Sequence, residues 1–314
     1  MQSDILLHTM SSIPAIAFEG VTKQFGSFTA VNNLSFEVPQ GSIFGFLGPN
    51  GSGKSTSLRM MMDLIRPSAG DIRLFGDSMK THRASLMRRM GSMIEKPDFY
   101  GYLSAHTNLT LAARAYGISY SSAQYEALYK KVGLWGRQHD KVKTYSHGMK
   151  QRLGLAQALL HNPDLIILDE PNTGLDPQGI IDLRHLMLDL NRQEGKTILF
   201  SSHILSEVQA ICTDLVVIHA GKKKVEGRVA DLLSHEDVTV RIELDDAPAQ
   251  HALFRASSWF TADTLQEGNV YTLRMAKQSI PLLMADCSSK GITLWRVDYR
   301  NQLEDYFLKL TSTI

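Results

Sequence analysis

The feature that most constrains this chain is the glycine-rich segment GPNGSGKST at residues 48–56, which follows the pattern G-x-x-x-x-G-K-[ST]. The apolar residues 42–47 before it predict a buried strand, and residues 55–65 after it predict a helix. A loop of this pattern between a strand and a helix holds nucleotide phosphates, because its N–H groups and the helix N-terminus attract a polyanion. A glycine-rich turn without a ligand is the alternative, and the flanking elements and the Lys-Ser pair argue against it.

Individual residues of this loop have distinct expected roles. Its glycines let the backbone turn sharply and point N–H groups inward. Lys54 would reach the β- and γ-phosphates, and the Ser55 hydroxyl would ligate Mg²⁺. The residues expected to contact the nucleotide here are Gly48, Asn50, Gly51, Gly53, Lys54, Ser55 and Thr56.

A second segment, which ends in two acidic residues, completes the expected nucleotide site. The apolar run 165–168 predicts a strand that ends in Asp169 and Glu170. We expect Asp169 to hold Mg²⁺ through its water shell, and Glu170 to orient the attacking water or accept its proton. A strand followed by a solvated acidic turn is the simpler alternative.

Bulk composition sets limits on the class of protein. A length of 314 residues suggests about two domains. Lys plus Arg total 33 against 32 for Asp plus Glu, so the chain lacks the overall basic charge that would indicate nucleic-acid binding. No run approaches the roughly 18 apolar residues of a membrane-spanning helix, and residues 1–14 lack the basic start of a secretory signal. Cys212 and Cys287 are expected to be reduced thiols, and the protein to be cytoplasmic.

The order of predicted elements indicates an α/β fold with a mixed sheet. Residues 15–19 and 34–38 predict antiparallel strands, and 71–75 another strand. Helical periodicity dominates about 97–162, including helices at 107–116 and 123–132, as an insertion. Buried strands at 197–201 and 215–219, with a helix at 179–192, predict a parallel sheet covered by helices.

The C-terminal part has a different order of elements. The predicted order is strand, helix, strand, strand, helix, strand, which is the ferredoxin-like split unit of an α+β domain. These elements are expected at 237–244, 247–256, 260–265, 269–274, 278–290 and 292–298, with a last helix at 303–310. We therefore expect an ATP-binding domain at 13–234 and an accessory domain at 235–314.

The motifs, taken in order, resemble those of a known family. YSHGMKQR at 145–152 precedes a helix, and LDEP at 168–171, GLD at 174–176 and SSH at 201–203 follow it. This set over residues 16 to about 232 is similar to that of ABC-type ATPases, which implies a P-loop nucleotidase fold with ATP and Mg²⁺ as cofactors. A P-loop kinase would leave the 145–152 segment and His203 unexplained.

The resemblance implies roles for further residues. Ser146 and the amide of Gly148 would contact the γ-phosphate bound by a second subunit, as another helix N-terminus meeting phosphate. Asp176 would organise that interface, His203 would contact the γ-phosphate and help position water, and Phe25 would stack on adenine.

Three positions depart from the pattern of the family. His147 occupies a position that is usually glycine, which is acceptable if its backbone is not left-handed, and its imidazole could reach the interface. Glu95 replaces a glutamine near the metal, so its carboxylate would add charge there. The adenine platform is Phe25 rather than the commoner tyrosine.

The resemblance also implies partners. One phosphate loop and one 145–152 segment imply a homodimer, and a transporter needs separate membrane-spanning subunits, so the chain would lie peripherally on the inner face of the membrane. The aromatic residues of 97–103 could grip such a subunit or pack inward. The motifs look most like ATPases of bacterial exporters for antibiotics and peptides, of the bacitracin and lantibiotic-immunity kind. The alternative is a soluble ABC-type ATPase acting on ribosomes or nucleic acid, although no nucleic acid is expected as a partner.

Overall fold

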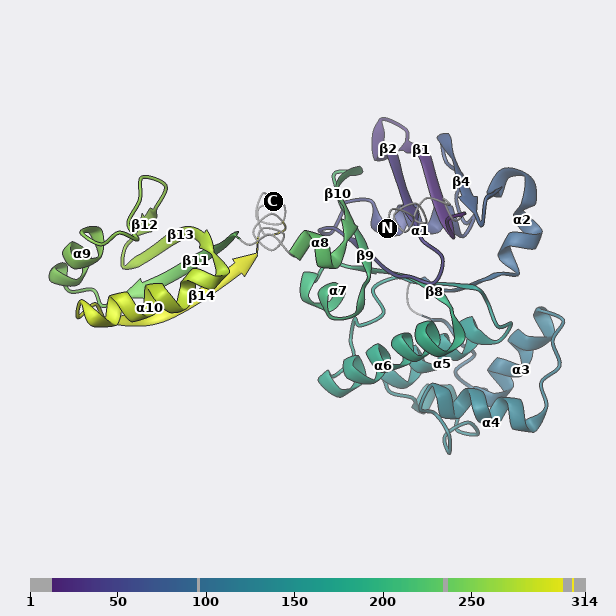
Figure 1. Cartoon of the computed structure of the whole chain (residues 1–314). Helices are drawn as coiled ribbons and strands as arrows, with labels where there is room; N and C mark the ends of the chain where they lie inside the picture. Colours follow the sequence, from purple (N-terminus) through teal and green to yellow (C-terminus); the bar gives the residue numbers. More distant parts are fainter. Residues whose placement is uncertain (1–12, 95–96, 234–236, 302–306, 308–314) are drawn as a thin grey trace, which may run out of the picture. The chain divides into compact units, whose positions relative to one another are not determined.

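The chain divides into two compact units, Met1–Gly227 and Arg228–Ile314 (Figure 1). The computed structural model describes residues 13–94, 97–233, 237–301 and Phe307. The domain limits expected from sequence, 13–234 and 235–314, stay a prediction. Within the described residues, no helix combines the length and the apolar character that a membrane crossing requires.

A six-stranded sheet forms the centre of the larger unit. The first of its strands along the chain, β3, pairs in parallel with β8 and β9, and β7 pairs in parallel with β6 and β8. All residues of β3, β7 and β8 are buried, as expected for parallel strands covered on both faces. The strand order is β10 (Lys222–Arg228), β9 (Asp214–His219), β3 (Ile43–Leu47), β8 (Thr197–Ser202), β7 (Leu165–Leu168) and β6 (Met90–Met93).

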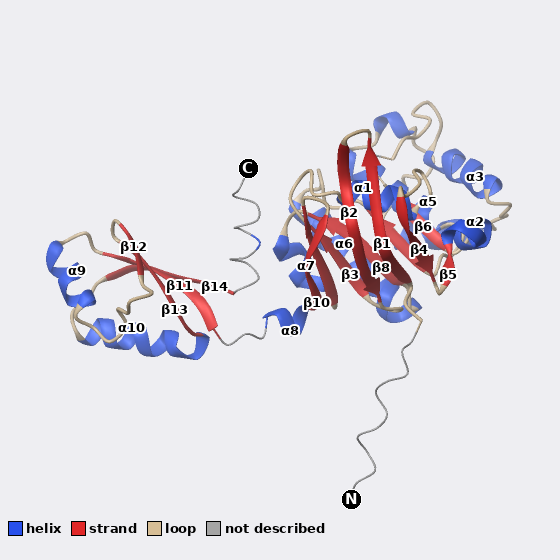
Figure 2. Cartoon of the chain, turned by 90° about the horizontal axis from the view of Figure 1, so that it is seen from above, coloured by secondary structure: helices blue, strands red, loops and turns tan. Residues whose placement is uncertain are grey.

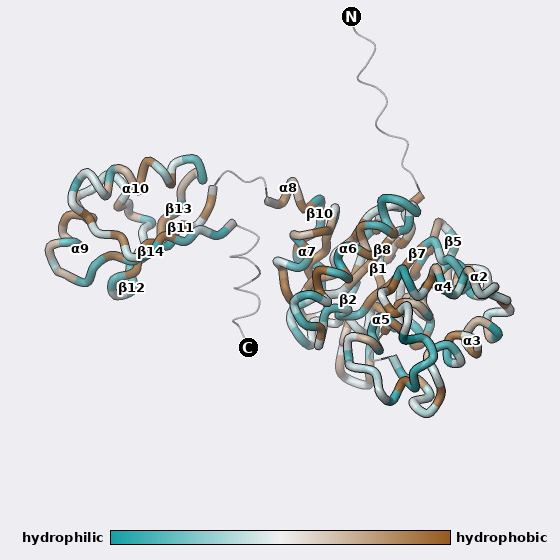
Figure 3. Tube along the Cα trace, turned by 90° about the horizontal axis from the view of Figure 1, so that it is seen from below, coloured by the Kyte–Doolittle hydropathy of each residue, from teal (hydrophilic) through white to brown (hydrophobic). Residues whose placement is uncertain are grey.

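A second, antiparallel sheet packs against the first. Its order is β2 (Phe28–Val38), β1 (Ile16–Phe25), β4 (Ala69–Leu74) and β5 (Asp77–Ser78), and the predicted pairing of 15–19 with 34–38 is confirmed. The Phe36 ring of β2 lies 4.7 Å from Phe18 and 5.4 Å from Phe46 of β3, measured between centroids. The two sheets therefore share one apolar core. Figure 3 shows hydrophobic residues along these central strands.

Helices surround the sheets of the larger unit. Gly45 of β3 lets one of them approach closely, since a Cβ there would lie 2.4 Å from Cγ1 of Val208. The helix after the glycine-rich loop ends at Met61 rather than at residue 65, because Asp63 has a left-handed backbone with φ +52°. The helices are α1 (Lys54–Met61), α2 (Met79–Met87), α3 (Ala105–Ala115), α4 (Ser122–Lys131), α5 (His147–Leu159), α6 (Pro177–Glu194) and α7 (Leu205–Ile211).

The smaller unit has the predicted split order of elements (Figure 2). Its sheet runs β12 (Leu265–Glu267), β13 (Val270–Ala276), β11 (Asp237–Leu244) and β14 (Leu294–Asn301), and its helices are α8 (Val229–Leu233), α9 (Pro248–Arg255) and α10 (Ile280–Ser289). Phe254 of α9 and Leu283 of α10 share one core with Val240 and Ile242, so both helices cover the same face of the sheet.

One expectation for the smaller unit is wrong, and another concerns residues that the structure does not describe. The strand expected at 260–265 is wrong, because the Thr261 N–H donates to Oγ1 of Thr264 at 2.9 Å in a turn, and only the short β12 follows. The expected helix at 303–310 lies outside the described residues, apart from Phe307.

Candidate active site

The glycine-rich loop connects β3 to α1, and two of its glycines have left-handed backbones. Gly51 has φ +76° and Gly53 has φ +103°, and a Cβ on Gly53 would lie 2.7 Å from the Ala30 carbonyl oxygen. Only glycine adopts this path without strain. Asn50 is exposed on the loop, and Ser55 and Thr56 are half-buried in the first turn of α1. The loop thus turns its backbone into the N-terminus of α1, as a phosphate site requires.

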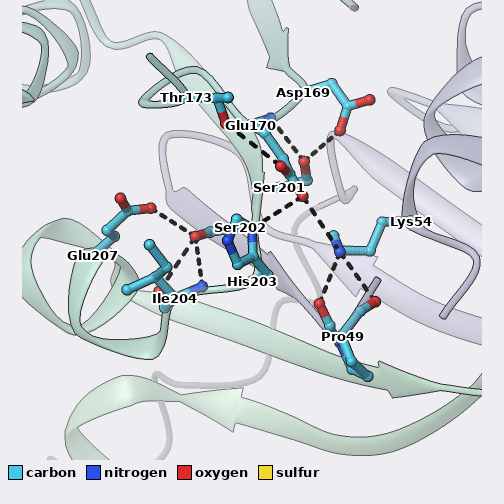
Figure 4. Close-up of polar contacts among 11 residues, drawn as sticks. Pro49, Lys54, Asp169, Glu170, Thr173, Ser201, Ser202, His203, Ile204 and Glu207 are labelled. Atoms are coloured by element: carbon cyan, nitrogen blue, oxygen red, sulfur yellow. Dashed lines mark hydrogen bonds and ion pairs between the residues drawn. The ribbon is translucent and has the colours of Figure 1, made fainter. Parts of the chain in front are cut away.

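Lys54 crosses from this loop to the acidic strand end (Figure 4). Its side chain is 5% exposed, and Nζ donates hydrogen bonds to the carbonyl oxygens of Gly48 at 2.7 Å and Pro49 at 3.2 Å. Nζ also lies 3.6 Å from Oε1 of Glu170. Burial lowers the pKa of Lys54, and the carboxylates of Glu170 and Asp169 oppose this shift. The ammonium is thereby held between the loop and the acids.

Asp169 and Glu170 come directly after β7, where a serine of the neighbouring strand orders both. The Ser201 hydroxyl of β8 donates to Oδ1 of Asp169 at 2.5 Å and accepts the Glu170 N–H at 2.9 Å. Glu170 itself has a left-handed backbone with φ +45°. Strain of this kind in a non-glycine residue concentrates at functional sites. The turn after β7 therefore fixes the backbone position from which the Glu170 side chain extends.

The Glu170 carboxylate has three neighbours from three segments (Figure 4). Oε1 lies 3.2 Å from Nδ1 of His203, which follows β8, and 3.6 Å from Lys54. Oε2 lies 3.5 Å from Oγ1 of Thr173. The structure thus brings together Lys54, Asp169, Glu170 and His203, which the sequence had predicted separately. A carboxylate beside an imidazole and an ammonium can orient water and take its proton.

The donors available to a metal suit Mg²⁺. Asp169 uses Oδ1 for Ser201, while Oδ2 makes no hydrogen bond with the described residues. The Ser55 hydroxyl lies in the first turn of α1, after Lys54, and Glu95 lies outside the described residues. No group of three or more His, Cys, Asp or Glu that could hold a metal occurs in the described part of the chain. Mg²⁺ is usually bound by only a few protein oxygens, and phosphates and water complete its coordination shell.

Ser146 begins the helix α5 at the motif predicted to meet a second subunit. It is the N-cap residue, and its hydroxyl accepts the Met149 N–H at 3.2 Å. Gly148 lies in the first turn, where a Cβ would sit 3.3 Å from the Leu175 side chain. The exposed start of this 13-residue helix offers N–H groups and a positive dipole end.

His147 lies against its own chain rather than pointing freely outward. It is the first residue of α5 and is not left-handed, as the sequence required. Nε2 lies 3.2 Å from the Thr173 carbonyl oxygen, and a Cβ on Gly174 would lie 2.6 Å from the imidazole. The histidine thus joins the 145–152 motif to the loop that follows Glu170.

Two predicted residues lie outside this cluster. Asp176 is the N-cap of α6, and its carboxylate accepts the Gly179 N–H at 3.1 Å. Phe25 is 49% exposed at the end of β1, with Nζ of Lys23 5.0 Å from its ring centroid. An exposed aromatic face is suited to stacking on a base, so the predicted role of Phe25 stays a prediction that the geometry permits.

Sequence reasoning gave no role to Ser201, Thr173 or Gln151. Ser201 falls in the SSH run at 201–203, so its neighbour His203 was the available signal. Thr173 accepts contacts from His147 and, at 3.5 Å, from Nε2 of the buried Gln151. Nothing in the local sequence marks Thr173 as a partner of His147 and Gln151, because these two residues lie more than 20 positions away.

Comparisons with known proteins agree with this geometry. A family model described as ABC transporter matches residues 31–173. Bacitracin transport ATP-binding protein BcrA of Enterococcus faecalis is 37% identical, over 94% of this chain and 96% of that protein. Nod factor export ATP-binding protein I of Ralstonia nicotianae is 32% identical, over 96% of this chain and 95% of that protein. A solved structure described as the ATP binding subunit of an ABC transporter aligns with a TM-score of 0.62 and 31% identity, over 69% of this chain and 91% of that chain.

Proposed function

This chain belongs to the ABC transporter family, and we propose that it is the ATP-hydrolysing subunit of an exporter for antibiotic or peptide cargo. It is an ATPase that powers transport. The observation that carries the proposal is the Glu170 carboxylate, held beside Lys54, His203 and Thr173 at the end of β7. An ATPase acting on ribosomes or nucleic acid does not agree with relatives whose names describe transport.

We assign ATP and Mg²⁺ to the loop and the acids. Lys54 and the N-terminus of α1 would bind the β- and γ-phosphates, and Ser55 and Asp169 would hold Mg²⁺. When bound, Mg²⁺ neutralises charge that develops on the phosphates during transfer. The Ser201 hydroxyl keeps Asp169 in place through its 2.5 Å hydrogen bond.

We assign the activation of water to Glu170 and His203. Glu170 would orient the attacking water and accept its proton, and His203 would hold that carboxylate and contact the γ-phosphate. The left-handed backbone of Glu170 and the hydrogen bond from its N–H to Ser201 hold its main chain, and the contacts with Lys54 and His203 orient its carboxylate. This prior ordering reduces the cost of reaching a reactive geometry.

A second copy of the chain would complete the site. Ser146 and Gly148 lie at an exposed helix start whose contacts are with α5 itself and the 173–175 loop. Such a helix start would bind the γ-phosphate of a nucleotide that is held by the glycine-rich loop of another copy. A two-fold dimer would place both motifs at two equivalent sites, and closing on ATP and reopening after hydrolysis would do the mechanical work.

Two exposed tyrosines offer a surface for the membrane-spanning subunit. Tyr100 is 57% exposed and Tyr102 67% exposed, whereas Phe99 is half-buried. Buried Asn108 fixes their loop, because it accepts the Tyr100 N–H at 2.9 Å and donates to the Tyr100 carbonyl at 3.2 Å. Exposed aromatic residues on a fixed loop are suited to a protein interface. We propose that they contact the transporter at the inner face of the membrane.

Export is the direction that the name of one relative supports. The test is to tag the chain, solubilise native membranes in mild detergent, and identify what co-purifies by mass spectrometry. A multi-span membrane protein in near-equal amounts is the expected result. Ribosomal proteins or nucleic acid in its place would overturn the proposal, and ATP-driven uptake by the reconstituted complex would overturn the direction.

A further inference from the structure

The smaller unit has one long edge strand and one short one. In its sheet, β14 pairs only with β11 among the described strands, and it is eight residues long. The opposite edge, β12, has three residues. Long exposed edges readily pair with another strand, and proteins usually shorten or cover them. The edge of β14 therefore calls for an explanation that β12 does not.

Side chains along β14 remain open to solvent. Trp295 is 69% exposed and Tyr299 is 49% exposed. Arg296 and Asp298 lie on the face of the sheet opposite to Tyr299, are 69% and 48% exposed, and form an ion pair at 2.5 Å. Exposed aromatic residues and two opposite charges thus lie along this edge strand.

The strand is complementary to a copy of itself. In an antiparallel pair centred on Val297, Arg296 of each copy opposes Asp298 of the other. Cross-strand pairs of opposite charge each stabilise a sheet by about 0.2–1 kcal/mol. This register contains two such pairs.

Other registers fit less well. A centre on Arg296 or on Asp298 sets that residue against its own copy, so like charges meet. A centre on Tyr299 sets Asp298 against Arg300 but leaves Arg296 opposite position 302, beyond the end of β14 at Asn301. The shift in the β11–β14 register leaves Trp295 without a partner in β11, so the regular edge of β14 begins at Arg296.

We propose that two copies of this chain join through β14, antiparallel and centred on Val297, so that two four-stranded sheets become one. This contact uses none of the residues of the nucleotide site. It is a second interface, independent of ATP, and it keeps two copies together while the ATP-dependent interface opens. A two-fold axis through Val297 makes the contact isologous and closed, so it stops at two copies.

Charge reversal tests the register. In the full chain without nucleotide, Asp298→Arg sets Arg against Arg, and Arg296→Asp sets Asp against Asp. We expect each variant to raise the dimer dissociation constant at least about tenfold in sedimentation equilibrium, because favourable pairs become repulsive. A mixture of the two variants restores opposite charges and should associate again. Glu267→Arg on the short β12 edge is the matched control and should behave as wild type.

The result that overturns the proposal is equally specific. It is a monomeric wild type at concentrations where the mixture is also monomeric, or variants that associate as tightly as wild type. Circular dichroism must show folded variants, since Arg296 and Asp298 also oppose Glu243 and Arg241 of β11. ATP hydrolysis by the same variants separates this proposal from the proposed function, because failure of one leaves the other measurable.

Cross-linking gives a second measurement that does not depend on charge. Val297→Cys at the centre should form a disulfide-linked dimer under mild oxidation, because Cα atoms opposed in an antiparallel pair lie about 4.5–5.5 Å apart. Cys212 and Cys287 are buried and give little background. A Tyr299→Cys variant that links better than Val297→Cys would overturn the Val297 register.

Discussion

His203 places Nδ1 3.2 Å from Oε1 of Glu170. The two residues lie just beyond neighbouring parallel strands, β7 and β8, whose carboxyl ends meet at one edge of the sheet. Ser201, two residues before His203, also anchors the Glu170 backbone and the Asp169 carboxylate. One strand end of β8 therefore positions both acids, and damage there should affect turnover before it affects ATP binding.

Replacing Glu170 with glutamine should abolish turnover and preserve ATP binding. The amide is similar in size but cannot accept a proton, so we expect hydrolysis to fall at least about 100-fold. ATP affinity, measured by calorimetry, should change little, and an ATP-bound dimer should accumulate on gel filtration. Hydrolysis near the wild-type rate would remove Glu170 from its assigned role.

Replacing His147 with alanine should lower kcat by about fivefold, because the Thr173 carbonyl would lose one hydrogen bond and the loop after Glu170 would loosen. The KM for ATP should stay near its wild-type value, and His147→Gln, which keeps a donor, should recover part of the rate. His185→Ala, at an exposed position of α6, is the control. Equal loss in both histidine-to-alanine variants would mean that the contact with Thr173 has no specific effect.

Alanine at both Tyr100 and Tyr102 should separate hydrolysis from membrane attachment. The two rings contact each other at 6.0 Å between centroids and do not line the nucleotide site. We expect the isolated variant to hydrolyse ATP as wild type does, while capture of the membrane-spanning subunit falls in a pull-down. Tyr116→Ala, another exposed tyrosine, provides the comparison. Undiminished capture would show that the subunit docks elsewhere.

Stability should fall in mild acid through His161. Burial lowers its pKa, Lys196 adds to the shift, and the hydrogen bond to the Met90 carbonyl opposes it. The folded state thus favours the neutral ring, and below the usual pKa of about 6.5 the unfolded chain binds more protons. The free energy of unfolding should therefore decrease as pH falls below about 6.5.

Urea unfolding at several pH values checks this expectation. His161→Gln should flatten the pH dependence, whatever it costs in packing against Tyr116, whose ring stacks at 4.5 Å. An unchanged slope between pH 7.5 and 5.5 would show that another group, such as His106 with its lowered pKa, dominates the dependence.

Local pattern predicted the parts of this protein that local chemistry determines. The glycine-rich loop, the buried strands and the acids after β7 were predicted from short sequences, because the spacing of residues in each indicates one type of local structure. The Lys222–Arg228 segment, for which no strand was predicted, forms β10 beside β9. Its charges are mostly exposed, and pairing at the sheet edge, which the local sequence does not encode, decided its structure.

The contacts that order the site were beyond sequence reasoning. Ser201 meets Asp169 across 32 positions and His147 meets Thr173 across 26. Such pairs depend on how strands and helices pack in three dimensions, and a single sequence carries no local signal for them. The side chains of the site could be named in advance, whereas the residues that hold them could not.

Complementation between two inactive variants tests most directly whether two copies of the chain share one nucleotide site. Lys54→Ala removes the phosphate contact of one copy, and Ser146→Arg blocks the helix start of the other. In a mixed dimer, the intact loop of the Ser146→Arg copy meets the intact helix start of the Lys54→Ala copy. The account predicts that the mixture hydrolyses ATP well above the sum of the two separate variants. A mixture that stays at that sum, with both variants folded and dimers formed, would contradict it.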